Sequence, residues 1–316
     1  MHKSNIDLSV LLIFFARPNT LREVFAKVKK ARPSRLFLAC DGPRDNNPQD
    51  ALSIEECKKI VSDIDWECEV FTNYSKENQG CGKGPSNAIS WAFEYTDKLV
   101  ILEDDCVPDD TFFPYMKEML DFYENDSRIG MVSGLNHFKN WDCNNSSYCF
   151  AKTGAIWGWG TWKRVWEKYD FYVKDIEKPY ISRLLQKEIA HKRAGKVRIK
   201  EWKHAAKETQ IKKVRYWDYQ FDFLKYSQSY LAIVPTGNLI HNIGVGIGST
   251  HTENKKSVVW KPGRALFMPT EPIQFPIKHP KYVICDREYD EMVLKKILYP
   301  PKFKKIPGKI KRRLFK

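Results

Sequence analysis

Three consecutive acids, Glu103, Asp104 and Asp105, are the residues best suited to chemistry in this chain. They follow the apolar run Leu99–Leu102, which is typical of a strand buried on both faces. Unpaired carboxylates inside such a strand would each cost several kcal/mol, so we expect the acids where the strand emerges. Ligands bind at that carboxyl edge of an open α/β sheet. Carboxylate oxygens there suit Mg²⁺ or Mn²⁺ holding a substrate diphosphate. The alternative is a solvated acidic turn.

The elements that must position these acids alternate along the first half of the chain. Strand-like apolar runs at 8–15, 35–40, 67–71, 99–103 and 129–133 are separated by segments with helical spacing of apolar residues. This alternation predicts βαβ units and a mostly parallel sheet flanked by helices. The first helix is expected to begin at Thr20, with Glu23 completing a capping box. Beyond Gly134 the pattern becomes irregular, and a turn is expected near Gly195 inside a basic helical stretch.

Composition and charge restrict the class of partner. A chain of 316 residues with 42% hydrophobic and 29% charged residues is typical of a globular protein with one large or two ordinary domains. The net charge of +14 favours a polyanionic partner such as a nucleotide, a nucleic acid, an anionic lipid or an acidic glycan. Between Lys295 and Lys316 lie ten Lys or Arg and no acid. Apolar residues are interleaved with these cations, which suits an anionic membrane surface. The same run is poor in aromatic residues, which argues against a nucleic-acid partner.

The cysteines and the apolar segments indicate a compartment. The eight cysteines show no close zinc-type pairs, so we expect free thiols in a reducing cytoplasm, with a Cys143–Cys149 bridge as the alternative. The apolar run Leu8–Phe15 is too short to span a bilayer and is interpreted as the first strand. The expected location is cytoplasmic, with the option of peripheral attachment to the inner face of the membrane.

The order of these motifs resembles the GT-A-fold glycosyltransferases, which carry a short acidic motif at the end of a central strand. The Glu103–Asp105 motif looks like the form found in the N-acetylglucosaminyltransferases that start complex N-glycans. Together with the segments Trp157–Trp162 and Ser249–Thr252, it resembles bacterial transferases of surface-glycan clusters, over about residues 8 to 255. The resemblance implies a nucleotide-sugar-binding α/β half at 1–134 and an acceptor-binding half of the same domain at 135–290. A basic C-terminal tail at 291–316 would follow.

The resemblance also implies a donor site. Asp105 would bind Mn²⁺ or Mg²⁺, which bridges the phosphates of a nucleotide sugar, most simply a UDP-sugar. If the strand continues, Glu103 points to the same side as Asp105 and Asp104 to the other, so one of these neighbours could reach the ribose or sugar. Further candidates are Arg17 for a phosphate, Asp41 for the base or ribose, Lys83 for the donor and His251 for the metal, each with a solvated loop position as its alternative.

The acceptor site is expected in the second half. Trp157 and Trp159 lie among glycines, where no regular face would bury them, so their rings could form a platform for a sugar. In inverting enzymes of the resembled type, an acid from this region takes the proton of the acceptor hydroxyl. Asp218 is our candidate, with Asp222 as the alternative and Tyr219 shaping the pocket.

The implied reaction is inverting transfer of a sugar to a hydroxyl of a surface-glycan or lipid-linked acceptor. A sugar-1-phosphate nucleotidyltransferase is the enzymatic alternative. Its glycine-rich phosphate loop should follow the first strand, whereas Ala16–Asn19 contains no glycine. A basic nucleic-acid-binding protein is the alternative from another class.

Overall fold

The fold is built on one eight-stranded sheet with the strand order β3-β2-β1-β4-β8-β6-β9-β7. The computed structural model describes residues 2–210, 216–244 and 268–300. His251, the rest of Ser249–Thr252 and residues 301–316 therefore lie outside the described part. The strands are β1 (Ile6–Phe14), β2 (Pro33–Cys40), β3 (Glu69–Tyr74), β4 (Lys98–Glu103), β6 (Ile129–Ser133), β7 (Tyr148–Ala151), β8 (Trp159–Trp162) and β9 (Leu231–Pro235). A separate two-stranded sheet joins β5 (Cys106–Pro108) to β10 (Ile240–Asn242).

The pairing confirms an α/β fold with a large, mostly parallel central sheet. β1 is parallel to β2 and β4, and β2 is parallel to β3. β8 enters antiparallel between β4 and β6, β9 is parallel to β6, and β7 is antiparallel to β9. Thus β3, β2, β1, β4, β6 and β9 point one way, and β8 and β7 point the other. The carboxyl ends of β1, β2 and β4 meet at one edge, as the sequence predicts.

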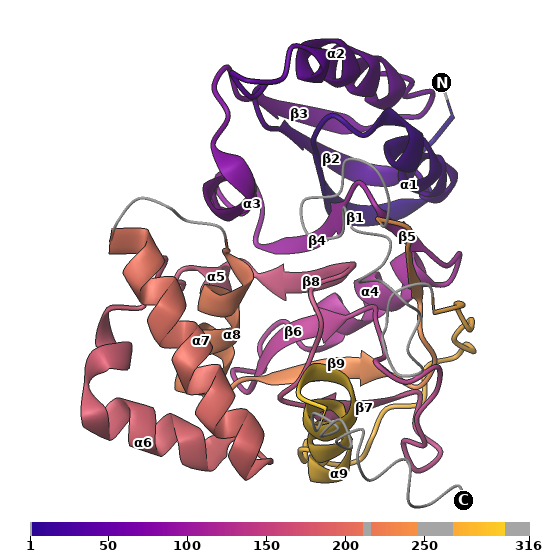
Figure 1. Ribbon diagram of the computed structural model, residues 1–316. Helices are drawn as coiled ribbons and strands as arrows, with labels where there is room; N and C mark the ends of the chain where they lie inside the picture. Colours follow the sequence, from indigo (N-terminus) through magenta and orange to yellow (C-terminus); the bar gives the residue numbers. More distant parts are fainter. Residues whose placement is uncertain (1, 211–215, 245–267, 301–316) are drawn as a thin grey trace, which may run out of the picture.

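Helices flank the sheet because each has one apolar face to bury (Figure 1). They are α1 (Pro18–Ala31), α2 (Gln49–Val61), α3 (Gly80–Ala92) and α4 (Phe112–Phe122). In α1, Leu21, Val24, Phe25 and Val28 are buried at helical spacing. The capping box predicted at Thr20 is wrong. The helix begins at Pro18, whose fixed φ suits a first helical position, and the Thr20 hydroxyl donates to the Arg17 carbonyl instead.

The second half adds helices beyond one end of β6, β8 and β9 (Figure 1). These are α5 (Lys163–Trp166), a 3₁₀ turn (Lys174–Glu177), α6 (Pro179–Glu188), α7 (Lys192–Gln210) and α8 (Asp218–Ser227). The turn predicted near Gly195 lies between α6 and α7 instead. Gly195 is inside α7, where a Cβ would stand 3.1 Å from the Gln186 carbonyl oxygen, so glycine lets the two helices approach closely.

The C-terminal segment is partly folded onto the second half. α9 (Arg287–Met292) continues into a π-helical turn, Val293–Leu298. Leu294 is fully buried in a cluster with Trp202 and Tyr226, and the Tyr299 hydroxyl donates to Glu201. The predicted tail boundary at 291 is therefore wrong, because residues up to 299 belong to the folded molecule.

Two expectations about the whole chain can be compared with the described residues. All eight cysteines are free, and five of them are buried, so the alternative Cys143–Cys149 bridge is not present. Among the residues that the structure describes, no helix has the length and apolar character needed to cross a bilayer.

Candidate active site

The acidic motif lies where β4 ends. Leu99–Leu102 is buried, the strand ends at Glu103, and the chain turns through Asp104 and Asp105. Asp104 is 1% exposed; its carboxylate accepts the Phe15 amide at 2.9 Å and pairs with one arm of Arg17. The other arm of Arg17 donates to Asp105 at 2.9 Å. Both aspartates thus share one guanidinium, so the strand alternation expected to separate them does not extend past Glu103.

Charge in this motif is balanced unevenly. Burial lowers the pKa of Arg17, but Asp104 and Asp105 outweigh it and raise that pKa above its ordinary value, so the guanidinium stays charged. Burial raises the pKa of Glu103, and the Asp105 and Asp104 carboxylates raise it further. Asp218, from α8 in the second half, also contributes to this rise in the pKa of Glu103. Acids from both halves of the chain therefore raise the pKa of Glu103, the first carboxyl of the motif.

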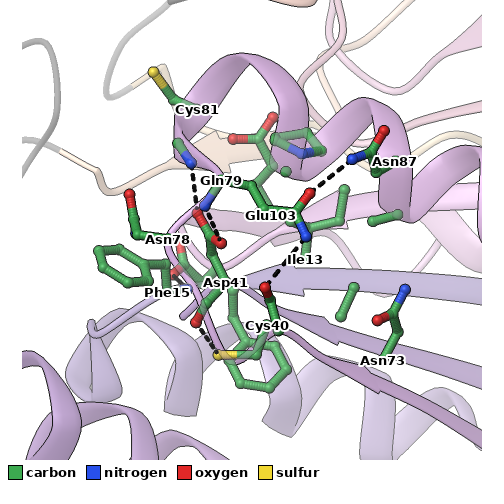
Figure 2. Close-up of a pocket in the computed structure, with 18 of the residues that line it drawn as sticks. Ile13, Phe15, Cys40, Asp41, Asn73, Asn78, Gln79, Cys81, Asn87 and Glu103 are labelled. Carbon is green, nitrogen blue, oxygen red and sulfur yellow. Dashed lines mark hydrogen bonds between the residues drawn. The ribbon is translucent and has the colours of Figure 1, made fainter. Parts of the chain in front are cut away.

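A cavity of about 290 Å³ opens beside the motif (Figure 2). The ends of β1 and β2, the end of β3 and the start of α3 surround it. Its lining includes the Phe14 and Phe15 rings, the Asn73 and Asn87 amides, Arg17, Asp41, Glu103 and Asp104. Asn87 donates to Gln79 at 2.7 Å, which orients one amide at the rim. Flat rings next to side-chain amides can hold a heterocycle by stacking and by hydrogen bonds.

Of the predicted donor residues, Asp41 lines this cavity and Lys83 does not. The Asp41 carboxylate accepts the backbone amides of Gly42, Gln79 and Gly80 at 2.8–2.9 Å, so it fixes the start of α3 against the end of β2. The glycine-rich segment Gly80–Gly84 forms the first turn of α3. Lys83 is exposed and lines a shallow hollow with Lys76 and Asn78, rather than the cavity.

Asp105 lies against the end of the second, two-stranded sheet. Its carbonyl accepts the Ile243 amide at 2.9 Å, and its carboxylate accepts the Asn242 side chain at 3.4 Å. A Cβ at Gly244 would come within 2.0 Å of an Asp105 carboxylate oxygen, so only glycine permits this approach. Within the described ranges, no three His, Cys, Asp or Glu side chains gather as a complete metal site. The Asp105 carboxylate nevertheless suits a hard cation whose other ligands come from a substrate.

A second cavity of about 500 Å³ lies in the second half of the chain. It is bordered by α7, α8, the loop before β8 and the π-helical turn. Trp157, Asp218, Tyr219 and Asp222 line it, as does the pair Arg198 and Lys225. Asp218 is the first residue of α8, and the buried side chains of Trp217 and Phe221 anchor that helix in the core. The structure thus brings three predicted acceptor-site residues, Trp157, Asp218 and Tyr219, to one cavity.

Trp159 corrects the prediction of an acceptor platform. It is fully buried, its ring stacks on Trp217 with centroids 5.9 Å apart, and it contacts Phe221 at 4.6 Å. The assumption that glycines leave no regular face is wrong here, because residues 159–162 form β8 and pair with β4 and β6. Trp159 is a core residue.

Buried charges at the floor of the second cavity were missed at the sequence level. Asp222 pairs with Arg198, accepts the Trp202 indole at 3.2 Å and lies 3.5 Å from the Lys225 ammonium. Lys225 also donates to the Gly154 carbonyl at 3.0 Å, which holds the loop that carries Trp157. Arg198 lies in the basic helix α7, where composition gives no sign that one cation points inward, and Lys225 is the one cation of α8. Their place on the buried faces of α7 and α8 is the signal that helical periodicity could have supplied.

The similarity of this chain to known proteins is remote. No family model matches the chain, and no curated protein matches its sequence. A UDP-glucose pyrophosphorylase solved with UDP-glucose is 9% identical, with a TM-score of 0.29 over 51% of this chain and 78% of that one. A cytidylyltransferase from Leptospira borgpetersenii is 15% identical, with a TM-score of 0.29 over 52% and 64%. Mouse xyloside xylosyltransferase 1 is 12% identical, with a TM-score of 0.27 over 42% and 54%. Likeness this remote leaves the activity to be argued from the site.

Proposed function

We propose that this protein is a metal-dependent glycosyltransferase that moves a sugar from a nucleotide-sugar donor, most simply a UDP-sugar, to a hydroxyl of a surface-glycan or lipid-linked acceptor. One observation carries the proposal. One cavity is lined by Glu103 and Asp104 of the acidic motif and the other by Asp218, whose carboxylate contributes to the raised pKa of Glu103. A transferase with two substrates needs such a pair of sites facing one reacting bond.

The donor half of the proposal rests on the first cavity. The nucleoside would lie against the rings and amides of Phe15, Asn73 and Asn87, with its diphosphate directed toward Arg17 and Asp105. Asp105 would hold Mn²⁺ or Mg²⁺, which when bound neutralises the charge that develops on the leaving diphosphate. Arg17 holds the carboxylates of Asp104 and Asp105 close together, because one guanidinium pairs with both.

The acceptor half rests on the second cavity. The ring of Trp157 offers an apolar face to a sugar, and Asp218 is the base that receives the proton of the acceptor hydroxyl. As that O–H bond breaks, the oxygen forms the new bond to the anomeric carbon. The bond from that carbon to the phosphate oxygen breaks, and the nucleoside diphosphate leaves with the electron pair. Attack from the side opposite the diphosphate inverts the anomeric centre.

The test measures donor hydrolysis, which needs no acceptor. The full chain is incubated with a panel of nucleotide sugars and Mn²⁺, and release of nucleoside diphosphate is followed. We expect metal-dependent release that falls at least about tenfold in Asp105→Asn, at the lower end of what loss of a residue at a metal site costs. Glu94→Gln, an exposed acid lining neither cavity, is the control and should hydrolyse the donor at the wild-type rate.

The same assay separates the enzymatic alternative. A sugar-1-phosphate nucleotidyltransferase would release pyrophosphate from a nucleoside triphosphate and a sugar 1-phosphate. Pyrophosphate release without hydrolysis of any nucleotide sugar would replace our proposal with that activity. Metal-dependent hydrolysis that is unchanged in Asp105→Asn would remove Asp105 from the cation site.

A further inference from the structure

The outer face of α7 carries an uninterrupted line of basic side chains. Arg193, Lys196, Lys200, His204 and Lys207 are all exposed and recur every three or four residues, so they occupy one side of the helix. We call them the basic stripe. At about 1.5 Å per residue it is about 21 Å long. The opposite side of α7 is buried and includes Ala194, Trp202 and Ala205.

The basic stripe is not balanced by neighbouring acids. None of the described acids forms an ion pair with Arg193, Lys196, Lys200 or Lys207, and only His204 has a partner, Glu208, at 3.3 Å. Lys196 and Lys200 are one turn apart, an arrangement in which like charges destabilise a helix. A helix face that only needs water usually mixes the two signs. An external polyanion would relieve this repulsion.

The neighbouring helix α6 adds exposed apolar groups. Tyr180 is 53% exposed and Leu184 is 52% exposed, and Arg183 and Lys187 lie on the same side of this helix by their spacing. Exposed apolar side chains between cations are typical of helices that lie in the interface of a bilayer, where the apolar groups enter the headgroup region.

These features belong to one packed unit that also reaches the second cavity. Leu185 and Ile189 of the α6 side share a buried cluster with Ala194 and Ile199 of α7. Arg198 and Glu201, on the sides of α7 away from the basic stripe, line the second cavity. A surface bound by the stripe would therefore lie on the other side of the helix that forms a wall of this cavity.

We propose that the α6–α7 hairpin docks on an anionic lipid bilayer through the basic stripe and the exposed Tyr180 and Leu184. Charge complementarity identifies the partner, and the exposed apolar side chains favour a bilayer over nucleic acid. The stripe carries no Phe, Tyr or Trp side chain on which bases could stack. Docking does not depend on the proposed reaction, but it would hold the second cavity close to a lipid-linked acceptor.

The test is co-sedimentation of the full chain with vesicles of phosphatidylcholine that contain about a third phosphatidylglycerol. Lys196→Gln, Lys200→Gln and Lys207→Gln are combined in one variant. Each basic residue near an anionic surface contributes a factor of about five, so the triple variant should bind on the order of 10²-fold more weakly. The control combines Lys59→Gln, Lys139→Gln and Lys278→Gln, which change three exposed lysines outside α6 and α7. These substitutions lower the net charge by the same amount. This control should bind within about twofold of wild type.

Each outcome of these experiments either supports or overturns docking through the hairpin. Equal losses in the two triple variants would mean that net charge alone acts and would overturn the assignment to the hairpin. No sedimentation of the wild type would overturn docking itself. A further variant, Tyr180→Ser with Leu184→Ser, should weaken vesicle binding severalfold while retention on a heparin or DNA column stays the same; retention without vesicle binding would make the partner a polyanion. Donor hydrolysis is measured on all variants and should be unchanged, so failure of docking and failure of the proposed reaction are separable.

Discussion

Two carboxylates in the second cavity, Asp218 and Asp222, differ in what surrounds them. Asp222 pairs with Arg198 and Lys225, which are 8% and 2% exposed, and so is the shared anion of two buried cations. Asp218 is the first residue of α8 and contributes to the raised pKa of Glu103. The Asp222 carboxylate is already engaged by two cations and by the Trp202 indole. The geometry therefore favours Asp218 as the base and gives Asp222 a structural role.

This contrast predicts different consequences for two isosteric changes. Asp218→Asn should leave metal-dependent donor hydrolysis nearly unchanged but lower kcat for transfer by a factor on the order of 10²–10⁴, the usual contribution of a general base. Asp222→Asn should instead lower the unfolding free energy by about 3–5 kcal/mol, because two buried cations lose their anion. Urea unfolding and transfer kinetics measure the two effects. Normal transfer by a folded Asp218→Asn enzyme would reject this residue as the base.

At the scale of elements, α9 is joined to the loop that carries Trp157. Asp290, 2% exposed, accepts the Lys152 and Thr153 amides at 2.9–3.0 Å and the Thr153 hydroxyl at 2.7 Å. At the next residue, the Gly154 carbonyl accepts a hydrogen bond from the Lys225 ammonium. The loop is thus held from both α8 and α9. A C-terminal element therefore helps to set the position of the predicted acceptor platform.

Replacing Asp290 should loosen that loop. In Asp290→Asn one oxygen becomes an amide that cannot accept, so a buried donor loses its partner at a cost of about 1–3 kcal/mol. We expect faster amide hydrogen exchange at residues 152 and 153 and a corresponding fall in the unfolding free energy. Glu291→Gln, an exposed acid on the same helix, is the matched control. Exchange rates that stay at wild-type values in Asp290→Asn would show that other contacts hold the loop.

The elements that could be predicted are those with long local patterns. The strand predicted at 129–133 has the bounds observed, and the helical spacing of Phe112, Met116 and Met119 matches the buried face of α4. β8 was missed because four residues, one of them glycine, give no periodicity, and its place between β4 and β6 depends on pairing with distant strands. Tertiary contacts, rather than local sequence, decided that Trp159 is buried.

In the candidate site, too, local sequence patterns predicted some features and tertiary contacts determined the others. The acidic triplet at the end of β4 could be located because buried strand and charge adjoin in sequence. The residues that pair with each acid could not be located from the sequence. Asp41 accepts backbone amides from a segment almost forty residues away, and Arg17 crosses to Asp104 and Asp105 from the end of β1. Such contacts depend on how the strand ends meet, which a single sequence does not record.

At the scale of the whole molecule, distant segments converge around His137. Its backbone amide donates to the Tyr289 hydroxyl of α9, and Lys225 of α8 and Arg198 of α7 contribute to its electrostatic environment. The His137 side chain is 9% exposed, and its Nδ1 has no hydrogen-bond partner among the described residues. Burial, and then the positive charges of Lys225 and Arg198, lower the pKa of His137 to about 4. The imidazole is neutral in the folded protein across the physiological range.

The linkage between this histidine and stability has a definite sign. An unfolded chain binds a proton at His137 below a pKa of about 6.5, whereas the folded protein binds it only near 4, so unfolding is favoured as the pH falls through that interval. Wild type should lose up to about 3 kcal/mol more unfolding free energy than His137→Gln between these limits. Comparing the two proteins removes the contributions of carboxylates, which both retain. Urea unfolding at a series of pH values gives the difference, with His2→Gln, an exposed histidine, as the control that should follow wild type. Parallel curves for wild type and His137→Gln would mean that the junction around His137 opens to solvent before the chain unfolds.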